Sequence, residues 1–259
     1  MELKIFQIDA FTSRLFGGNP AAVCPLHAWL PDALMQQIAM ENNLAETAFF
    51  VAEESGLRIR WFTPLKEVRL CGHATLAAAW VYFHHIEPNS NEVTFNSLSG
   101  PLGVTRKDNM LTLDFPVGEF QPAEPPAQLI QAIGMAPLEC YAGEDWLVRL
   151  DSDEAVRQLQ PDMRLLHQLE GRGVIVTAEG DDCDFVSRFF APKYGIDEDP
   201  VTGSAHTLLT PFWAQRLGKT RLLARQLSPR GGELQCQLHE ARVLIGGQVT
   251  PYLQGVITL

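Results

Sequence analysis

The apolar residues of this chain recur in short stretches that predict strands more often than helices. Residues 57–62 alternate between apolar and polar side chains, a pattern typical of a half-buried strand. Further strands are predicted over residues 3–10, 47–51, 92–96, 110–115, 174–177, 185–190, 243–245 and 256–259. Because most neighbouring strands lack the intervening helix that a parallel crossover needs, we expect mostly antiparallel sheets.

Helices are predicted where apolar residues recur with a helical period between start and stop signals. Pro31 and Asp32 begin one helix, which Asn42 and Asn43 end. Residues 74–83 are almost entirely apolar, which predicts a helix that is buried on most sides. Others are expected over residues 127–133, 153–159, 163–169 and 205–217, and residues 17–20 read as a turn. The expected class is α+β.

Two blocks of sequence occur twice at a nearly constant spacing. The block Arg60-Trp61-Phe62-Thr63-Pro64 leads into Cys71-Gly72-His73-Ala74, and Arg188-Phe189-Phe190-Ala191-Pro192 leads into Thr202-Gly203-Ser204-Ala205. The glycines of the second block, Gly72 and Gly203, are 131 residues apart (203 − 72), about half of the 259 residues. We therefore predict two pseudo-symmetric lobes, each a curled sheet around a central helix. The proline-rich stretch 116–126 separates a lobe of residues 1–116, which a closing strand near 250–259 joins, from a lobe of residues 117–249.

Each lobe should contribute one helix that begins at a glycine, Gly72 or Gly203. The free N–H groups at such a helix start attract anions, and a glycine permits close backbone approach. If the two helix starts face each other, they enclose a pocket for a small acid. His73 and Ser204 would then point into this pocket, although each could equally be a helix cap with no further role.

Glu46 lies beside a strongly apolar run in Ala45-Glu46-Thr47-Ala48-Phe49. A carboxylate there is either on the wet face of a strand or held in a dry site. A carboxyl group in a dry site has a raised pKa, which a general acid or base at neutral pH needs. Asp199 could assist such chemistry or could simply brace the turn before Gly203.

Composition and charge narrow the class of protein. The net charge of −11, from 20 basic and 31 acidic residues, argues against nucleic acid and anionic membranes as partners. Five scattered cysteines without a C-x-x-C pair predict a reducing compartment. The start of the chain does not read as a signal peptide, and no apolar run reaches the roughly 20 residues of a spanning helix. We expect a cytoplasmic protein.

Common catalytic signatures are missing from the chain. It has no H-E-x-x-H, G-x-x-x-x-G-K-[ST], G-x-G-x-x-G or G-x-S-x-G motif, which weakens the metalloenzyme, nucleotide-binding and serine-hydrolase hypotheses. A hydrolase that uses Ser204, His73 and Asp199 stays open as an alternative. So does a non-catalytic interaction protein that keeps the fold for binding a partner.

The ordered blocks of the chain resemble the PhzF family of isomerases. The matching stretches run nearly from end to end: 9–11 and 18–23, 43–49, 62–64 and 70–75 in the first half, and 187–192, 198–206 and 230–234 in the second half. The resemblance implies a fold like that of diaminopimelate epimerase, with no metal and no organic cofactor, in a homodimer. It implies a proton shift within a small unsaturated or amino-substituted carboxylic acid, as the phenazine enzyme performs on dihydro-hydroxyanthranilate.

Carried over residue by residue, the resemblance makes Glu46 the proton carrier, with assistance from His73, Asp199 and Ser204. The residues that would bind the substrate are Asn19, Gly72, Thr202, Gly203 and Gly231. One departure concerns related epimerases and racemases, which use two cysteines as paired acid and base. Here Cys71 occupies the first of these positions and Thr202 the second. Threonine is too weak an acid or base to complete a symmetric two-base racemase near neutral pH. The alternative is a dehydratase or epimerase of the same fold that uses Cys71 and Thr202. Cys71 can also be a small buried apolar residue.

Overall fold

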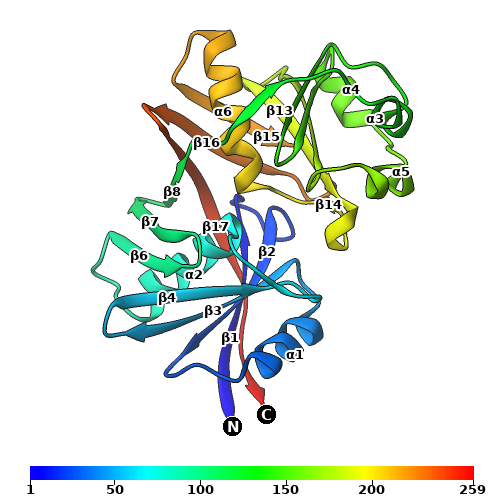
Figure 1. Cartoon of the computed structure of the whole chain (residues 1–259). Coiled ribbons are helices and arrows are strands. Elements are labelled where there is room, and N and C mark those ends of the chain that lie inside the picture. The colour runs from blue at the N-terminus through cyan, green and yellow to red at the C-terminus, as the bar shows by residue number, and fades with distance from the viewer. The chain divides into compact units, whose positions relative to one another are not determined.

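The chain, described from residue 1 to 259 in a computed structural model, divides into two compact units (Figure 1). Unit 1 comprises residues 1–115 and 244–259, and unit 2 comprises residues 116–243. Both combine helices and strands, so the α+β class is confirmed. The sequence analysis placed residues 244–249 in the second lobe. They belong instead to unit 1, because one continuous strand carries them into the pairing of Val249 with Ala10.

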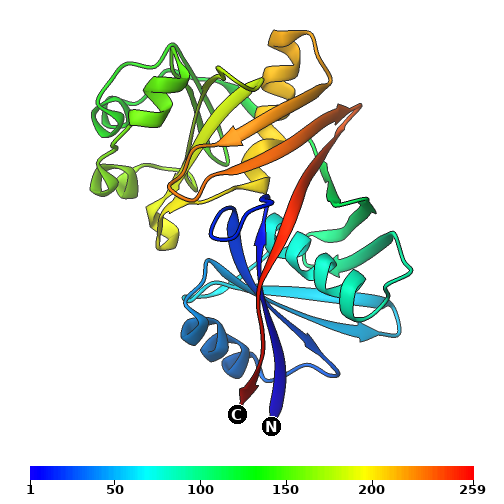
Figure 2. The same cartoon turned by 180° about the vertical axis from the view of Figure 1, so that it is seen from behind.

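Unit 1 contains most of its residues in strands. The strands are β1 (Glu2–Ala10), β2 (Asn19–Leu26), β3 (Glu46–Glu53), β4 (Gly56–Phe62), β5 (Glu67–Val68), β6 (Glu92–Ser97), β7 (Gly100–Lys107), β8 (Met110–Pro116) and the long C-terminal β17 (Arg242–Thr258). Its helices are α1 (Asp32–Asn42) and α2 (Gly72–His85). The two chain ends lie together in Figures 1 and 2, where the Met1 ammonium donates to the Leu259 carbonyl at 2.5 Å.

Eight of these strands form a closed ring. The hydrogen-bonded order is β17, β1, β2, β3, β4, β6, β7, β8, and β8 pairs again with β17. Only β2–β3 and β4–β6 are parallel pairs, so the sheet is mostly antiparallel, as expected. Closure of the ring removes the exposed edges that an open sheet would have.

Helix α2 is the central helix of unit 1 and contacts β1, β2 and β3. Ten of its 14 residues are buried, which confirms the prediction from the apolar run of residues 74–83. The amphipathic α1 packs Met35, Ile38 and Ala39 against Phe49 and Phe62 in a separate core. Strand β3 therefore meets a helix on both faces, and residues 47–51 are buried in succession rather than in alternation.

Unit 2 repeats this order of elements. Its strands are β9 (Phe120–Pro122), β10 (Glu139–Gly143), β11 (Trp146–Arg149), β12 (Val174–Glu179), β13 (Phe185–Ala191), β14 (Ile196–Asp199), β15 (Arg221–Gln226) and β16 (Gly232–His239). Its helices are α3 (Ala127–Ile133), α4 (Asp153–Gln158), α5 (Met163–Gln168) and α6 (Gly203–Leu217), with a 3₁₀ turn over Pro192–Tyr194.

The pairing of the strands is repeated as well. The parallel pair β11–β12 corresponds to β2–β3, and the parallel pair β13–β15 corresponds to β4–β6. Helix α6 corresponds to α2, contacts β15 and β16, and has nine of its 15 residues buried. Helices α3, α4 and α5 cover the opposite face with a second apolar core. The motif spacing of 131 residues thus reflects a repeated topology.

Three predictions of local structure were wrong. The two closing strands are one strand, β17, in which Pro251 follows Gly246 and Gly247; a bulge opposite Gln7 and Ile8 accommodates the proline. Residues 19–20 begin β2 rather than complete a turn. The proline-rich stretch 116–126 contains β9, because an extended proline backbone suits an edge strand.

Candidate active site

Glu46 and His73 form a buried pair in unit 1. Glu46 is the first residue of β3 and His73 the second residue of α2. Glu46 Oε2 and His73 Nε2 lie 3.2 Å apart, and their side chains are 13% and 6% exposed. The two atoms approach closely without the alignment of a hydrogen bond. Catalytic contacts are often loose before a substrate binds, so this distance is within reach of a proton transfer.

Asn19 holds the other side of the imidazole ring. Its Nδ2 lies 3.1 Å from His73 Nδ1, and both side chains are buried. Because an amide NH₂ can only donate, His73 Nδ1 must accept, and the proton of the neutral ring is then on Nε2. The Cys71 thiol is 3.5 Å from the same Nδ1. The Nε2–H group therefore faces the Glu46 carboxylate.

Burial keeps this imidazole neutral. It lowers the pKa of His73 from 6.5 to about 3, because the charged ring would lose its hydration. At neutral pH the cluster thus contains one neutral donor, His73, directed at Glu46. A neutral imidazole can stabilise and orient a carboxylate without taking its charge.

The helices behind both predicted sites begin without a side-chain cap. Cys71 precedes α2 and Thr202 precedes α6, and neither side chain accepts a hydrogen bond from the first turn of its helix. Neither helix has an acidic residue in its first turn. The N–H groups that start at Gly72 and Gly203 therefore retain the positive end of the helix dipole, which favours anions.

Three side chains of unit 1 have the donor atoms of a metal site. Each of these residues, Glu46, Cys71 and His73, offers one potential ligand atom, and the three atoms lie within 4.8 Å of one another. However, the ring presents Nδ1 to Cys71 and Nε2 to Glu46. One cation between all three would need Cys71 and Glu46 to face the same ring nitrogen. The observed ring orientation suits hydrogen bonding better than coordination.

The unit 2 residues Asp199 and Thr202 form a second buried cluster, together with Gln226. Thr202 Oγ1 donates to Asp199 Oδ2 at 2.5 Å. Gln226 Nε2 donates to Thr202 Oγ1 at 3.1 Å and to the Asp199 carbonyl at 2.7 Å, and Gln226 Oε1 accepts from the Thr202 N–H at 2.8 Å. The proton of the Thr202 hydroxyl is thus committed to Asp199, which weakens the case for Thr202 as an acid or base.

Ser204, the second residue of α6, contacts different partners. Its Oγ accepts from Arg172 Nη2 at 3.1 Å, and Arg172 is paired with the fully buried Asp145. Within unit 2, Ser204 therefore has no base and no link to Asp199 of the kind that a hydrolytic serine needs. The sequence analysis missed Arg172, Asp145 and Gln226. Alignment of the two halves by strand starts, rather than by motif, could have pointed to the first two.

Gly231 lies in the turn before β16, with a φ of +66° that glycine tolerates. Its N–H donates to Ser228 Oγ at 3.0 Å, and that hydroxyl donates to the Pro200 carbonyl at 2.8 Å. The structure thus brings together Asn19, Glu46, Gly72 and His73 in unit 1. In unit 2 it joins Asp199 to Thr202 and links Gly231 through Ser228 to the neighbouring Pro200. Ser204, beside Gly203 at the start of α6, contacts Arg172 instead.

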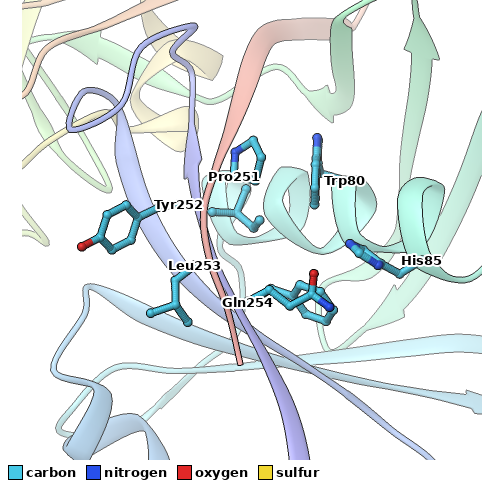
Figure 3. A pocket seen from close by; sticks show the side chains of 8 residues that line it. Trp80, His85, Pro251, Tyr252, Leu253 and Gln254 are labelled. Atoms are coloured by element: carbon cyan, nitrogen blue, oxygen red, sulfur yellow. The ribbon is translucent and has the colours of Figure 1, made fainter. Parts of the chain in front are cut away.

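A surface pocket lies at the other end of α2 (Figure 3). It has a volume of about 230 Å³, and Trp80 and His85 from α2 face Pro251 and Gln254 from β17. Burial, with His84 and Lys4 nearby, lowers the pKa of His85. The pocket contains no carboxylate and no thiol, so it lacks the acid and base groups that gather around His73.

No helix of the chain is long and apolar enough to cross a membrane.

Comparison with known proteins gives a consistent result. The model of the phenazine biosynthesis-like protein family (PhzC-PhzF) matches residues 8–255. Two uncharacterized isomerases of Pseudomonas aeruginosa are 51% and 54% identical over 259 and 260 residues, and all of each chain is covered. A crystal structure of a PhzF family protein from Enterococcus faecalis is 47% identical, covers all of both chains and superposes with a TM-score of 0.97.

More distant structures share the fold alone. A hydroxyproline epimerase from Agrobacterium vitis is 11% identical with a TM-score of 0.63, and a probable proline racemase from Agrobacterium radiobacter is 10% identical with a TM-score of 0.67. Each covers 99% of this chain. These neighbours support the epimerase-like fold expected from the sequence. By its full-length matches, the chain belongs to the PhzC-PhzF family of phenazine biosynthesis-like proteins.

Proposed function

We propose that this protein is a cofactor-independent isomerase that moves a proton within a small unsaturated or amino-substituted carboxylic acid, with Glu46 as the proton carrier. The observation that supports this most directly is the position of Glu46, 3.2 Å from a buried and neutral His73. Its relatives at about half identity, which match the full length of the chain, are named isomerases.

The chemistry of the site follows from its groups. A carboxylate of Glu46 takes a proton from a carbon next to the acid group or the double bond of the substrate, and returns it at another carbon. The Nε2–H group of His73 stabilises the Glu46 carboxylate while the transferred proton is on the substrate. The uncapped start of α2 at Gly72 offers N–H groups that stabilise negative charge as it develops on the substrate.

For unit 2, the proposal concerns contacts with an acidic group of a ligand. We assign these contacts to Ser204 and to the N–H group of Gly203, and we assign to Asp199 and Thr202 the support of the α6 start. The predicted homodimer and cytoplasmic location remain proposals that sedimentation and cell fractionation test directly.

The alternative that uses Cys71 and Thr202 as acid and base is less well supported. The Thr202 hydroxyl already donates to Asp199 and accepts from Gln226. An elimination or epimerisation that needs a second acid or base would have to break this network. A purely non-catalytic role is less well supported, because relatives that match the full length of the chain at about half identity are named isomerases.

The decisive experiment is proton exchange in D₂O. Small unsaturated and amino-substituted carboxylic acids, with 3-hydroxyanthranilate derivatives among them, are incubated with the enzyme, and proton NMR detects deuterium at carbon. We expect Glu46→Gln to lower the exchange rate by about 10²-fold to 10⁴-fold, since the base is lost. Glu53→Gln is the matched control, because Glu53 ends the same strand and accepts only from Trp29 Nε1 at 2.7 Å. Exchange at the wild-type rate in Glu46→Gln would exclude Glu46 as the carrier.

A further inference from the structure

Arg172 is a half-buried cation that the proposed reaction does not yet use. It precedes β12 by two residues, and its guanidinium lies over the ring of Phe189, 5.4 Å from the ring centre. Its Nε donates to Asp145 Oδ1 at 2.9 Å and its Nη2 donates to Asp145 Oδ2 and to Ser204 Oγ, the latter at 3.1 Å. Asp145 is fully buried and the Arg172 side chain is 23% exposed.

This cluster occupies the same places in unit 2 as the Glu46 cluster does in unit 1. Asn19 begins β2, and Asp145 directly precedes the corresponding β11. Glu46 begins β3, and Arg172 lies two residues before the corresponding β12. In both units the third member is the second residue of the central helix, His73 in α2 and Ser204 in α6. The repeat therefore places a three-residue polar cluster at the uncapped start of each central helix.

The hydrogen bonds fix which way the Ser204 hydroxyl can act. Burial works to lower the pKa of Arg172, but the hydrogen bonds and charge of Asp145 outweigh it and raise that pKa, so the guanidinium stays charged. A guanidinium can only donate, so Ser204 Oγ accepts from it. The Ser204 hydroxyl donates to no group in the chain, and Thr207 uses the Ser204 carbonyl instead. Its proton is left for a bound ligand.

We propose that Arg172, held by Asp145, is a positioning residue that makes Ser204 a hydrogen-bond donor to the carboxylate group of the substrate. The inference rests on the proposed function, because it takes the substrate to be a small carboxylic acid. Arg172 polarises the hydroxyl, and its bidentate pairing with Asp145 fixes the angle at which Nη2 meets Ser204. Without the arginine, the serine could turn its proton toward the protein and offer the ligand a lone pair.

Equilibrium binding of anthranilate and its neutral amide, anthranilamide, tests this proposal. The two probes have the same ring and amine and differ in whether the acid group is charged. The main variant is Arg172→Gln with Asp145→Asn, which removes both charges together and leaves no buried carboxylate unpaired. Ser204→Ala and the triple variant complete a cycle. The control is Arg149→Gln with Glu139→Gln, which removes another ion pair of unit 2, 2.9 Å long and 28% exposed at each side chain, together with the contact of Glu139 to Arg216.

We expect calorimetry to show that the Arg172/Asp145 variant binds anthranilate about 10-fold to 100-fold more weakly than the wild type, because a charge-assisted hydrogen bond is lost. Anthranilamide binding and the control variant should be unchanged. The triple variant should bind no more weakly than Ser204→Ala, since Arg172 acts through Ser204. Four results would each overturn the proposal. The first two are losses of affinity that add up in the triple variant and an equal loss of affinity for anthranilamide. The other two are unchanged binding of anthranilate by the Arg172/Asp145 variant and no binding of anthranilate to the wild type. Because binding needs no turnover, a failure of proton exchange through Glu46 would be seen separately.

Discussion

The tautomer of His73 can be changed by a single substitution. Asn19 Nδ2 donates to His73 Nδ1 from 3.1 Å, so the ring holds its proton on Nε2. Asn19→Asp has nearly the same shape, but its carboxylate can only accept a hydrogen bond. Nδ1 must then carry a proton, either through a change of tautomer or through protonation of the whole ring.

The size of the effect follows from the distance. At 3.1 Å and an effective dielectric constant of about 20, a carboxylate and an imidazolium attract each other by about 5 kcal/mol, or about 4 pKa units. Burial of the new carboxylate opposes its ionisation, because Asn19 is fully buried, so part of this attraction is lost. We therefore expect the pKa of His73 to rise from about 3 by at least about 2 units.

Nitrogen-15 NMR of the imidazole rings measures both the tautomer and the pKa. The chain has seven histidines, and the spectrum of His73→Gln identifies the signals of His73. In the wild type we expect a neutral ring with the proton on Nε2 from pH 7 down to pH 4. In Asn19→Asp we expect a proton on Nδ1 and titration in the range from pH 5 to 7. Asn19→Leu, which offers neither donor nor acceptor, should keep the ring neutral.

The exchange assay links this change to catalysis. An imidazolium between two carboxylates would hold Glu46 in an ion pair and weaken it as a base, so Asn19→Asp should slow proton exchange while Asn19→Leu slows it less. A wild-type ring with its proton on Nδ1 would contradict the argument, because Asn19 would then present its oxygen to the ring. An unchanged pKa in Asn19→Asp would contradict the assumed electrostatic coupling.

Three further predictions concern other residues of the two clusters. Cys71→Ser should keep proton exchange at the wild-type rate, since Glu46 carries the proton; loss of exchange would favour the cysteine-based alternative. Thr202→Val should lower the free energy of unfolding, measured with guanidinium chloride, by about 1–3 kcal/mol, because Asp199 loses a buried donor and Gln226 loses an acceptor. A change near zero would mean that this hydrogen-bond network contributes no net stability. Burial lowers the pKa of His206 from 6.5 to about 4, so the unfolded chain binds the proton at a higher pH than the folded chain does. The stability that is present above pH 6.5 is therefore lost as the pH falls to 4, by up to about 3 kcal/mol. In His206→Gln this part of the loss should disappear from denaturation curves measured between pH 7 and 4, and an equally steep loss would refute the assignment.

Local signals in the sequence were sufficient for the central helices. The apolar run of residues 74–83 predicts a helix that is covered on most sides, and the glycines at 72 and 203 mark where α2 and α6 begin. The resemblance of motifs, rather than any periodicity, singled out Glu46. A carboxylate at the start of a strand looks the same in a sequence whether the strand end is wet or dry.

Contacts between distant strand starts could not be predicted from patterns. Asn19 approaches His73 across 54 residues, and Arg172 reaches Asp145 across 27 residues and Ser204 across 32. The order of β2 beside β3, and of β11 beside β12, decides which polar side chains lie next to a helix start. The apolar periods of two residues in a strand and 3.6 residues in a helix carry no information about which strands pair. For the same reason, the sequence analysis did not connect Asn19 with His73, whose Nδ1 lies 3.1 Å from Asn19 Nδ2. The assignment of Asn19 to substrate binding stays a prediction.

The repeated topology gives the two units different polar chemistry at matching positions. Each unit presents a polar cluster at the start of its central helix, but the side chains differ in charge. Unit 1 has a carboxylate beside a neutral imidazole, which leaves Glu46 as a group that can accept a proton. The corresponding cluster of unit 2 has an arginine paired with an aspartate beside the Ser204 hydroxyl. A symmetric pair of bases would suit racemisation, where a proton leaves one face and arrives at the other. The position that corresponds to Glu46 in unit 2 is held by Arg172, so the repeat supplies no second base there. A single carboxyl group suits the proposed shift, in which the same group removes the proton and returns it.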